Sequence, residues 1–168
     1  MPHPLVTQLY FARKEFVRCI AGITADEAAQ RLLPMNSISW IVGHLANQEQ
    51  GYWLTMAQGK TPFPDLDQLV GYGQPASTPP ITDMWATWDV ITESSNVYLE
   101  TLTTADLPKH ITWQGGLSRE DLGTMLLRNI HHYWFHTGEA HAIRQQLGHE
   151  NLPDFVGDMS QFGYQSDV

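Results

Sequence analysis

The sequence contains a single cysteine, Cys19, and it has nine basic residues against eighteen acidic ones. One cysteine excludes an internal disulfide and favours a reducing compartment, so we expect a cytoplasmic protein. The formal net charge of −9 at pH 7 excludes the basic surface that nucleic-acid binding requires. The same charge opposes attraction to an acidic membrane surface.

Long hydrophobic runs are also absent. The longest stretch without a charged residue, 32–48, contains too many polar side chains to span a bilayer. The N-terminus has no basic leader followed by an apolar run, so we do not expect a signal peptide. Neither a membrane nor a nucleic acid is therefore an expected partner. At 168 residues, we expect one domain, 1–168.

Helical periodicity dominates the remainder of the sequence. Four long segments carry apolar residues at steps of three and four, which is the pattern of amphipathic helices. We expect them at 5–20, 37–58, 82–102 and 118–147. Ser118 fits as the cap of the last helix, with acidic residues in its first turn. A capping box from Thr24 to Glu27 predicts a further short helix through Leu32 or Leu33.

The segments between these helices differ in kind. Residues 59–80 are rich in proline and glycine, which forbids a continuous helix and suits a crossover between two parallel helices. The stretch 103–117 is also irregular, although 111–113 fits a locally extended segment. We expect the tail, 149–168, including Phe155, to pack partly on the helices. These features predict an all-α fold: an up-down-down-up four-helix bundle with a long crossover between helices two and three.

The eight histidines are not equivalent. Only His132 and His136 lie four apart, which places both rings on one face of a helix. That spacing allows one helix to offer two imidazoles to one metal ion. His131 and His141 face other directions around the same helix. A third candidate, His44, lies on the inward row of the second long helix.

The predicted faces of these histidines favour a shared metal. A buried neutral imidazole carries one donor and one acceptor that must both be satisfied. One cation satisfies the acceptor nitrogens of His44, His132 and His136 together, and it leaves each N–H for another partner. An antiparallel arrangement of the second and fourth helices brings the three to similar heights. Ordinary core or surface histidines, bonded to backbone or water, remain the commoner outcome for such a short motif.

Several neighbours of these histidines have two interpretations. Trp40 lies four residues before His44 and could wall a pocket, although core packing is the commoner role. Glu139, three residues after His136, could orient that ring or bind weakly as a fourth ligand, while a solvated carboxylate or an ion pair is commoner. Cys19 fits a small buried hydrophobe better than a nucleophile. The candidate hydrogen-bond partners of the histidines are Asn47, Gln48 and Asn129.

Two segments resemble motifs of DinB/YfiT-like proteins. Asn36–Ala46 (NSISWIVGHLA) resembles the second-helix motif of that family, and His132–Glu139 (HYWFHTGE) resembles its HxxxH motif. The resemblance implies an up-down-down-up four-helix bundle, usually a homodimer. It also implies a divalent metal, often Zn, Ni or Fe, held by His44, His132 and His136. Thr137 and Glu139 stand where arginine and glutamine are frequent in the family, which weakens any assignment of substrate.

Two function hypotheses follow. Three imidazoles leave at least one coordination position open, as in catalytic sites. Some proteins of the resembled family are transferases or isomerases that use bacillithiol, mycothiol or glutathione. The first hypothesis is therefore a metal-dependent enzyme that acts on a small-molecule substrate with a low-molecular-weight thiol. The alternative is a non-enzymatic module of the stress response that binds a metal or a small ligand.

Overall fold

The computed structural model describes residues 1–154 and 156–164, and within them the chain is mostly helical. The helices are α1 (Pro4–Cys19), α2 (Ala25–Ala29), α3 (Ile38–Glu49), the π-helix η1 (Gln50–Met56), α4 (Leu66–Val70), α5 (Ile81–Leu99) and α6 (Leu122–Gln146). The strands β1 (His110–Trp113) and β2 (Gly116–Asp121) form an antiparallel hairpin. The expected all-helical character is thus confirmed in its main part. The extended segment expected at 111–113 is confirmed as part of β1, while its pairing with β2 was not predicted.

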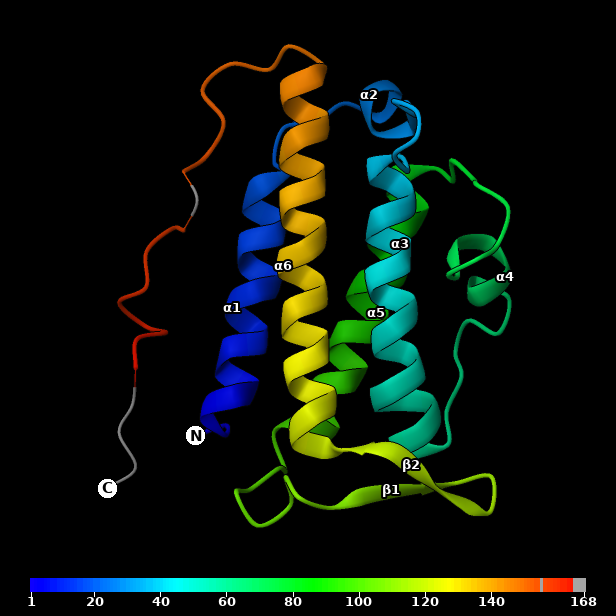
Figure 1. Cartoon of the computed structure of the whole chain (residues 1–168), viewed down its shortest axis with the longest axis vertical. Coiled ribbons are helices and arrows are strands. Elements are labelled where there is room, and N and C mark those ends of the chain that lie inside the picture. The colour runs from blue at the N-terminus through cyan, green and yellow to red at the C-terminus, as the bar shows by residue number, and fades with distance from the viewer. Residues whose placement is uncertain (155, 165–168) are drawn as a thin grey trace.

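The long helices lie alongside one another, and the hairpin crosses one end of them (Figure 1). α1 packs against α6, while α3 packs against both α5 and α6. α3 and α6 run in opposite directions in Figure 1. This antiparallel contact brings the middle of α3 level with the middle of α6, where the candidate histidines lie.

The core is built from the apolar rows that the sequence predicts. Every helix contributes side chains that are almost wholly removed from solvent, and each such aliphatic or aromatic side chain stabilises the fold by about 1.5–3 kcal/mol. Fully buried examples are Val6, Leu9, Phe16, Ile41, Leu45, Ile91, Leu99, Leu126 and Tyr133. α3 begins where Ser37 caps it, since the Ser37 hydroxyl accepts a hydrogen bond from the Trp40 N–H at 3.2 Å.

The start of the last helix differs from the prediction. Ser118 was expected to cap it, but Ser118 lies in β2, where its hydroxyl accepts a hydrogen bond from the Ile111 N–H at 2.9 Å. Asp121 caps α6 instead, and its Oδ1 accepts from the Thr124 N–H at 2.7 Å. Serine and aspartate cap helices about equally well. Pairing with β1 therefore decides between them.

The short second helix is confirmed in its start and wrong in its length. Thr24 and Glu27 form the predicted capping box. The helix ends at Ala29, short of Leu32, because the backbone of Gln30 is extended. The crossover, 59–80, is not one helix, as expected, yet it contains α4, which packs against α3.

The described part of the tail runs along α1. The Asp154 carbonyl accepts a hydrogen bond from Arg18 at 2.7 Å, and the Gly157 N–H donates to Glu15 at 2.9 Å. Further along, the ring of Phe162 stacks on Phe11 with centroids 4.9 Å apart. Phe155, which was expected to pack with this segment, and residues 165–168 lie outside the described residues.

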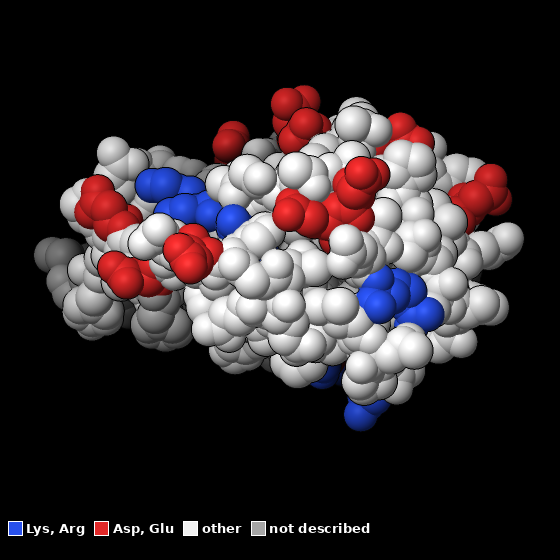
Figure 2. All heavy atoms as spheres, turned by 90° about the horizontal axis from the view of Figure 1, so that it is seen from above, with Lys and Arg blue, Asp and Glu red and all other residues white. Residues whose placement is uncertain are grey.

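The surface carries both signs of charge. On the end face shown in Figure 2, acidic side chains are spread over the surface and small groups of lysine and arginine lie among them. Among the described helices, none combines the length and the apolar character that crossing a membrane requires.

Candidate metal centre

The structure brings together the three histidines that the sequence nominates. His44 comes from α3, while His132 and His136 come from adjacent turns of α6. One ring nitrogen from each lies within 4.8 Å of the others, and the ring centroids are 4.7–5.2 Å apart. His136 is buried and the other two are half-buried. Three side chains from two helices therefore converge on one point.

Hydrogen bonds fix two of the three rings. The Nδ1 atom of His44 lies 2.8 Å from the carbonyl oxygen of Val70, and the Nδ1 atom of His136 lies 2.8 Å from Oε2 of Glu139. Carbonyl and carboxylate oxygens only accept, so both Nδ1 atoms carry the proton. Both Nε2 atoms are therefore left as lone-pair donors to a metal. Of the alternatives expected for Glu139, the structure shows the contact of an ion pair with His136, and this contact also orients the ring.

The ring of His132 is the unusual member of the group. Its Nε2 lies 3.1 Å from Nε2 of His136, and its buried Nδ1 has no hydrogen-bond partner among the described residues. If the proton is on Nε2, Nδ1 is a buried acceptor without a donor. If the proton is on Nδ1, two lone pairs face each other. A cation shared by the Nε2 atoms removes this second conflict, so the donor set fits a metal ion.

The local electrostatics keep the rings of His44 and His132 neutral. Burial, reinforced by the charges of His136 and His44, lowers the pKa of His132 to about 3. Burial also lowers the pKa of His44, although its hydrogen bond to Val70 acts the other way. The hydrogen bond from His136 lowers the pKa of Glu139. At neutral pH, His44 and His132 thus keep the lone pairs that metal binding requires.

Trp40 and Gly43 shape the α3 side of the site. The indole of Trp40 stacks on the ring of His44, with centroids 4.3 Å apart and an angle of 17° between the planes. Trp40 is also buried, so it is both a core residue and a wall of the site. A Cβ on Gly43 would lie 2.5 Å from Sδ of Met84 and 3.1 Å from Val70. The missing side chain therefore allows α4 to approach α3, which places the Val70 carbonyl beside His44.

The surface beside the site is hollowed at His132, the one histidine of the three that lines the hollow. A hollow of about 500 Å³ opens there, and we call it the His132 hollow. It is lined by Gln48, Thr124, Leu127, Arg128, His131, His132 and Phe135. His131 and Phe135 are exposed, as their position on the outer face of the helix predicts. A ligand in this hollow lies against one of the three imidazoles.

The predicted hydrogen-bond partners of the histidines behave differently from the expectation. Asn47 donates to Asp67 at 2.8 Å and takes no part in the site. Asn129 donates to Gln48 at 3.1 Å instead of to a histidine. The partner that sequence reasoning missed is the carbonyl of Val70, because a backbone atom placed by the fold leaves no signal in side-chain spacing.

Cys19 is a buried residue outside the three-histidine group, and its burial was predicted. It is buried, and its Sγ contacts the carbonyl oxygen of Thr137 at 3.5 Å. Burial raises the pKa of its thiol. A buried thiol with a raised pKa is a poor nucleophile, so any sulfur chemistry at the histidines needs a thiol from another molecule.

Comparison with known proteins agrees with this geometry. A search of curated proteins found no match. A family model described as the DinB superfamily matches residues 8–140, a range that holds all three histidines and both of the motifs noted in the sequence. Because the match covers most of the chain, the protein belongs to the DinB superfamily.

Proposed function

We propose that the protein is a divalent-metal-dependent enzyme whose metal, Zn, Ni or Fe, is held by His44, His132 and His136. One observation carries the proposal. The Nδ1 atoms of His44 and His136 are each committed to a protein acceptor, while the ring nitrogens of all three histidines gather within 4.8 Å. When bound, such a metal supplies a Lewis acid that favours the deprotonated form of a water or thiol.

The resemblance to DinB/YfiT-like proteins supports a particular class of reaction. We propose transfer or isomerisation of a small-molecule substrate with a low-molecular-weight thiol such as bacillithiol, mycothiol or glutathione. Because Cys19 is buried, the sulfur must come from this second molecule. The protein's own part is to fix the imidazoles through Val70 and Glu139 and to admit both reactants through the His132 hollow.

The finer architecture belongs to the same proposal. We propose that the four long helices form an up-down-down-up four-helix bundle, in which 59–80 is the crossover. The opposite directions of α3 and α6 support this order. The resemblance to DinB/YfiT-like proteins supports a homodimer, and the single cysteine supports a cytoplasmic location. Light scattering of the purified protein tests the dimer, since a monomeric mass would contradict it.

Elemental analysis of protein purified without an affinity tag tests the metal. We expect a stoichiometric divalent metal in the wild type and its loss in His132→Ala. His131→Ala is the matched control, because His131 is the adjacent residue of α6 and is exposed. Unchanged metal in His132→Ala would overturn the site.

Activity is measured separately on the metal-loaded protein. We expect it to consume one of the three thiols in the presence of an electrophile from a panel of small molecules, and we expect His132→Ala to lack this activity. If the metal is present but no thiol is consumed, the enzymatic proposal fails. The non-enzymatic module, which binds a metal or a small ligand in a stress response, then becomes the better description.

A further inference from the structure

Gln48 lies one helical turn after His44 on α3, and its side chain lines the His132 hollow. The three-histidine site does not use it. Its side chain is half-buried, so it is partly open to a ligand. Which end of its amide faces that ligand depends on the residues behind it.

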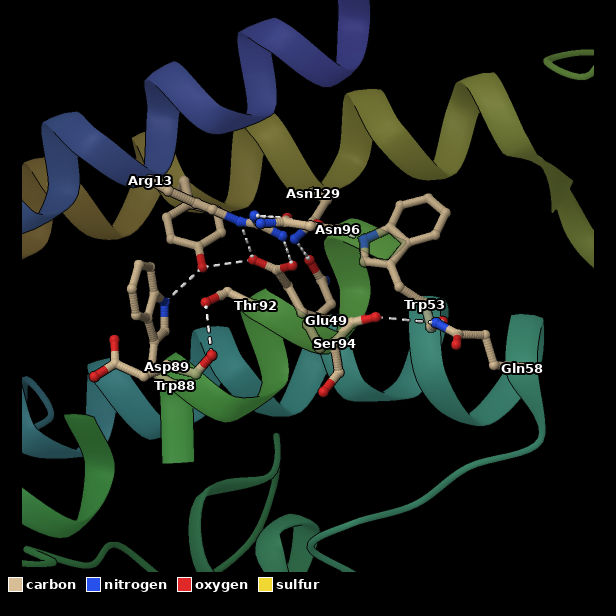
Figure 3. A network of polar contacts seen from close by, with 12 residues as sticks. Arg13, Glu49, Trp53, Gln58, Trp88, Asp89, Thr92, Ser94, Asn96 and Asn129 are labelled. Carbon is tan, nitrogen blue, oxygen red and sulfur yellow. Dashed lines mark hydrogen bonds and ion pairs between the residues drawn. The ribbon is translucent and has the colours of Figure 1, made fainter. Parts of the chain in front are cut away.

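A buried chain of hydrogen bonds fixes the direction of this amide. The indole nitrogen of Trp53 donates to Oδ1 of Asn129 at 2.8 Å, and an indole N–H can only donate. Oδ1 of Asn129 is therefore the acceptor, and its Nδ2 is left to donate to Oε1 of Gln48 at 3.1 Å. Trp53 and Asn129 are fully buried, and Figure 3 shows them within the polar network of the core.

The consequence is a hydrogen-bond donor at the edge of the His132 hollow, because Gln48 lines both that hollow and the adjoining one. With its Oε1 taken by Asn129, Gln48 is left with its two amide N–H groups. Among the described residues, no acceptor contacts them. Rotating the amide to present its oxygen would place its N–H groups against those of Asn129, so two donors would face each other. The site therefore recognises an acceptor atom on its ligand.

The other residues that line the hollow restrict the class of ligand further. Arg128 brings a guanidinium to the same hollow. Glu120, which lines the adjoining hollow, holds Nε and Nη2 of Arg128 in a bidentate ion pair, so Nη1 is the part of the guanidinium left to donate to a ligand. Leu127 and Phe135 add partly exposed apolar surface. An N–H donor, a cation and an apolar wall together suit a small molecule with an apolar body and one carboxylate.

We propose that the His132 hollow binds the carboxylate of a small apolar acid and that the amide N–H groups of Gln48 hold one of its oxygens. The inference rests on the proposed function, because it gives the substrate class of the same site. Trp53 and Asn129 pre-orient the donor, so binding requires no rearrangement of the amide.

The test uses 4-fluorobenzoate as the probe and follows its fluorine NMR signal during titration with zinc-loaded protein. We expect binding to the wild type. In Gln48→Glu, one carboxylate oxygen still accepts from Asn129 while the other faces the hollow, so we expect at least tenfold weaker binding. Gln48→Met removes the donor without adding charge, and we expect several-fold weaker binding. The neutral 4-fluorobenzamide should bind the wild type more weakly than the acid.

Gln145→Glu is the matched control. It makes the same chemical change on an exposed residue near the far end of α6, and we expect binding equal to that of the wild type. Zinc content and circular dichroism are measured for each variant, so a loss of metal or of fold is seen directly.

Two kinds of failure are separable. If zinc-loaded wild type does not bind the acid, or binds the amide equally well, the inference is overturned while the metal site stands. Equal affinities in the wild type and both Gln48 variants also overturn it. If the wild type takes up no zinc, the proposed metal-dependent function is overturned. The inferred substrate class is then overturned as well, because it rests on that function.

Discussion

At the scale of single residues, Glu139 determines how His136 is presented. Its Oε2 lies 2.8 Å from Nδ1 of His136, which fixes the tautomer with Nε2 free. A ring held in one tautomer and one orientation binds a metal more tightly than a ring that must first rotate. The carboxylate therefore contributes to the site by orienting one of its three imidazoles.

We expect Glu139→Ala to weaken metal binding by about 10- to 100-fold, the usual cost of losing such a partner. Glu139→Gln should lose less metal affinity than Glu139→Ala, because its amide oxygen can still accept a hydrogen bond from His136. Competition with a chromophoric zinc chelator measures both affinities. An unchanged dissociation constant in Glu139→Ala would show that the ring of His136 does not depend on this carboxylate.

A second residue, Glu27, makes the stability of the folded protein depend on pH in the acidic range. The hydrogen bond from the Thr24 backbone, with help from His149 and the Thr24 hydroxyl, lowers the pKa of Glu27 from 4.5 to about 2. The unfolded chain then takes up the proton before the folded one. The contribution of Glu27 to stability is therefore complete above about pH 4.5 and is lost as the pH falls toward about 2.

We expect Glu27→Gln to lack this pH-dependent contribution to stability. The thermal midpoint of the variant should fall less steeply than that of the wild type across the same pH window. Glu150→Gln removes an exposed carboxylate elsewhere and should follow the wild type. Parallel curves for Glu27→Gln and the wild type would contradict the argument.

At the scale of elements, a buried ion pair ties the long helices together. Arg13 of α1 forms a bidentate pair with Glu49, the last residue of α3. Glu49 also accepts from Tyr133 of α6 at 2.7 Å, and Arg13 donates to Asn96 of α5 at 2.7 Å. Burial and the charge of Glu49 raise the pKa of Tyr133. The phenol thus stays protonated and donates to the carboxylate. Figure 3 shows Arg13, Glu49 and Asn96 of this cluster between the helices.

Glu49→Gln is expected to destabilise the protein by about 3–5 kcal/mol, because it leaves the Arg13 guanidinium buried without a counter-charge. The double variant Arg13→Met, Glu49→Met removes both charges and should recover most of that loss. Chemical unfolding of the metal-free proteins measures the free energies. A double variant no more stable than Glu49→Gln would contradict the idea.

The elements also show where sequence reasoning works and where it stops. Long helices are predictable because many turns repeat the same apolar spacing. The hairpin is too short for alternation to be seen, and its turn uses Gln114 and Gly115, both with positive φ. Asparagine is commoner than glutamine before such a glycine, so the turn signal is weak. The choice of Asp121 over Ser118 as the cap of α6 follows from strand pairing, which no local pattern encodes.

At the scale of the whole molecule, the site depends on two helices that are distant in the sequence. The spacing of His132 and His136 is local, and so it could be read from the sequence. His44 reaches them only through the antiparallel contact of α3 with α6. In the sequence, the sole indication of this contact was that the three histidines would lie at similar heights along antiparallel helices. The Val70 carbonyl was not predictable, because it depends on how the crossover folds back on α3.

A metal held between two helices should stabilise the whole fold. An ion that binds only the folded state adds about 2.7 kcal/mol when its free concentration is 100 times its dissociation constant. We expect zinc to raise the unfolding midpoint of the wild type, and a chelator to reverse the effect. His131→Ala should show the full rise. In His44→Ala the imidazole of α3 is missing, so a metal ion bound by the two histidines of α6 no longer links α6 to α3. The rise in the unfolding midpoint should then largely disappear. Thermal unfolding with and without zinc measures all three proteins. A full rise in His44→Ala would mean that the two histidines of α6 bind the metal without α3.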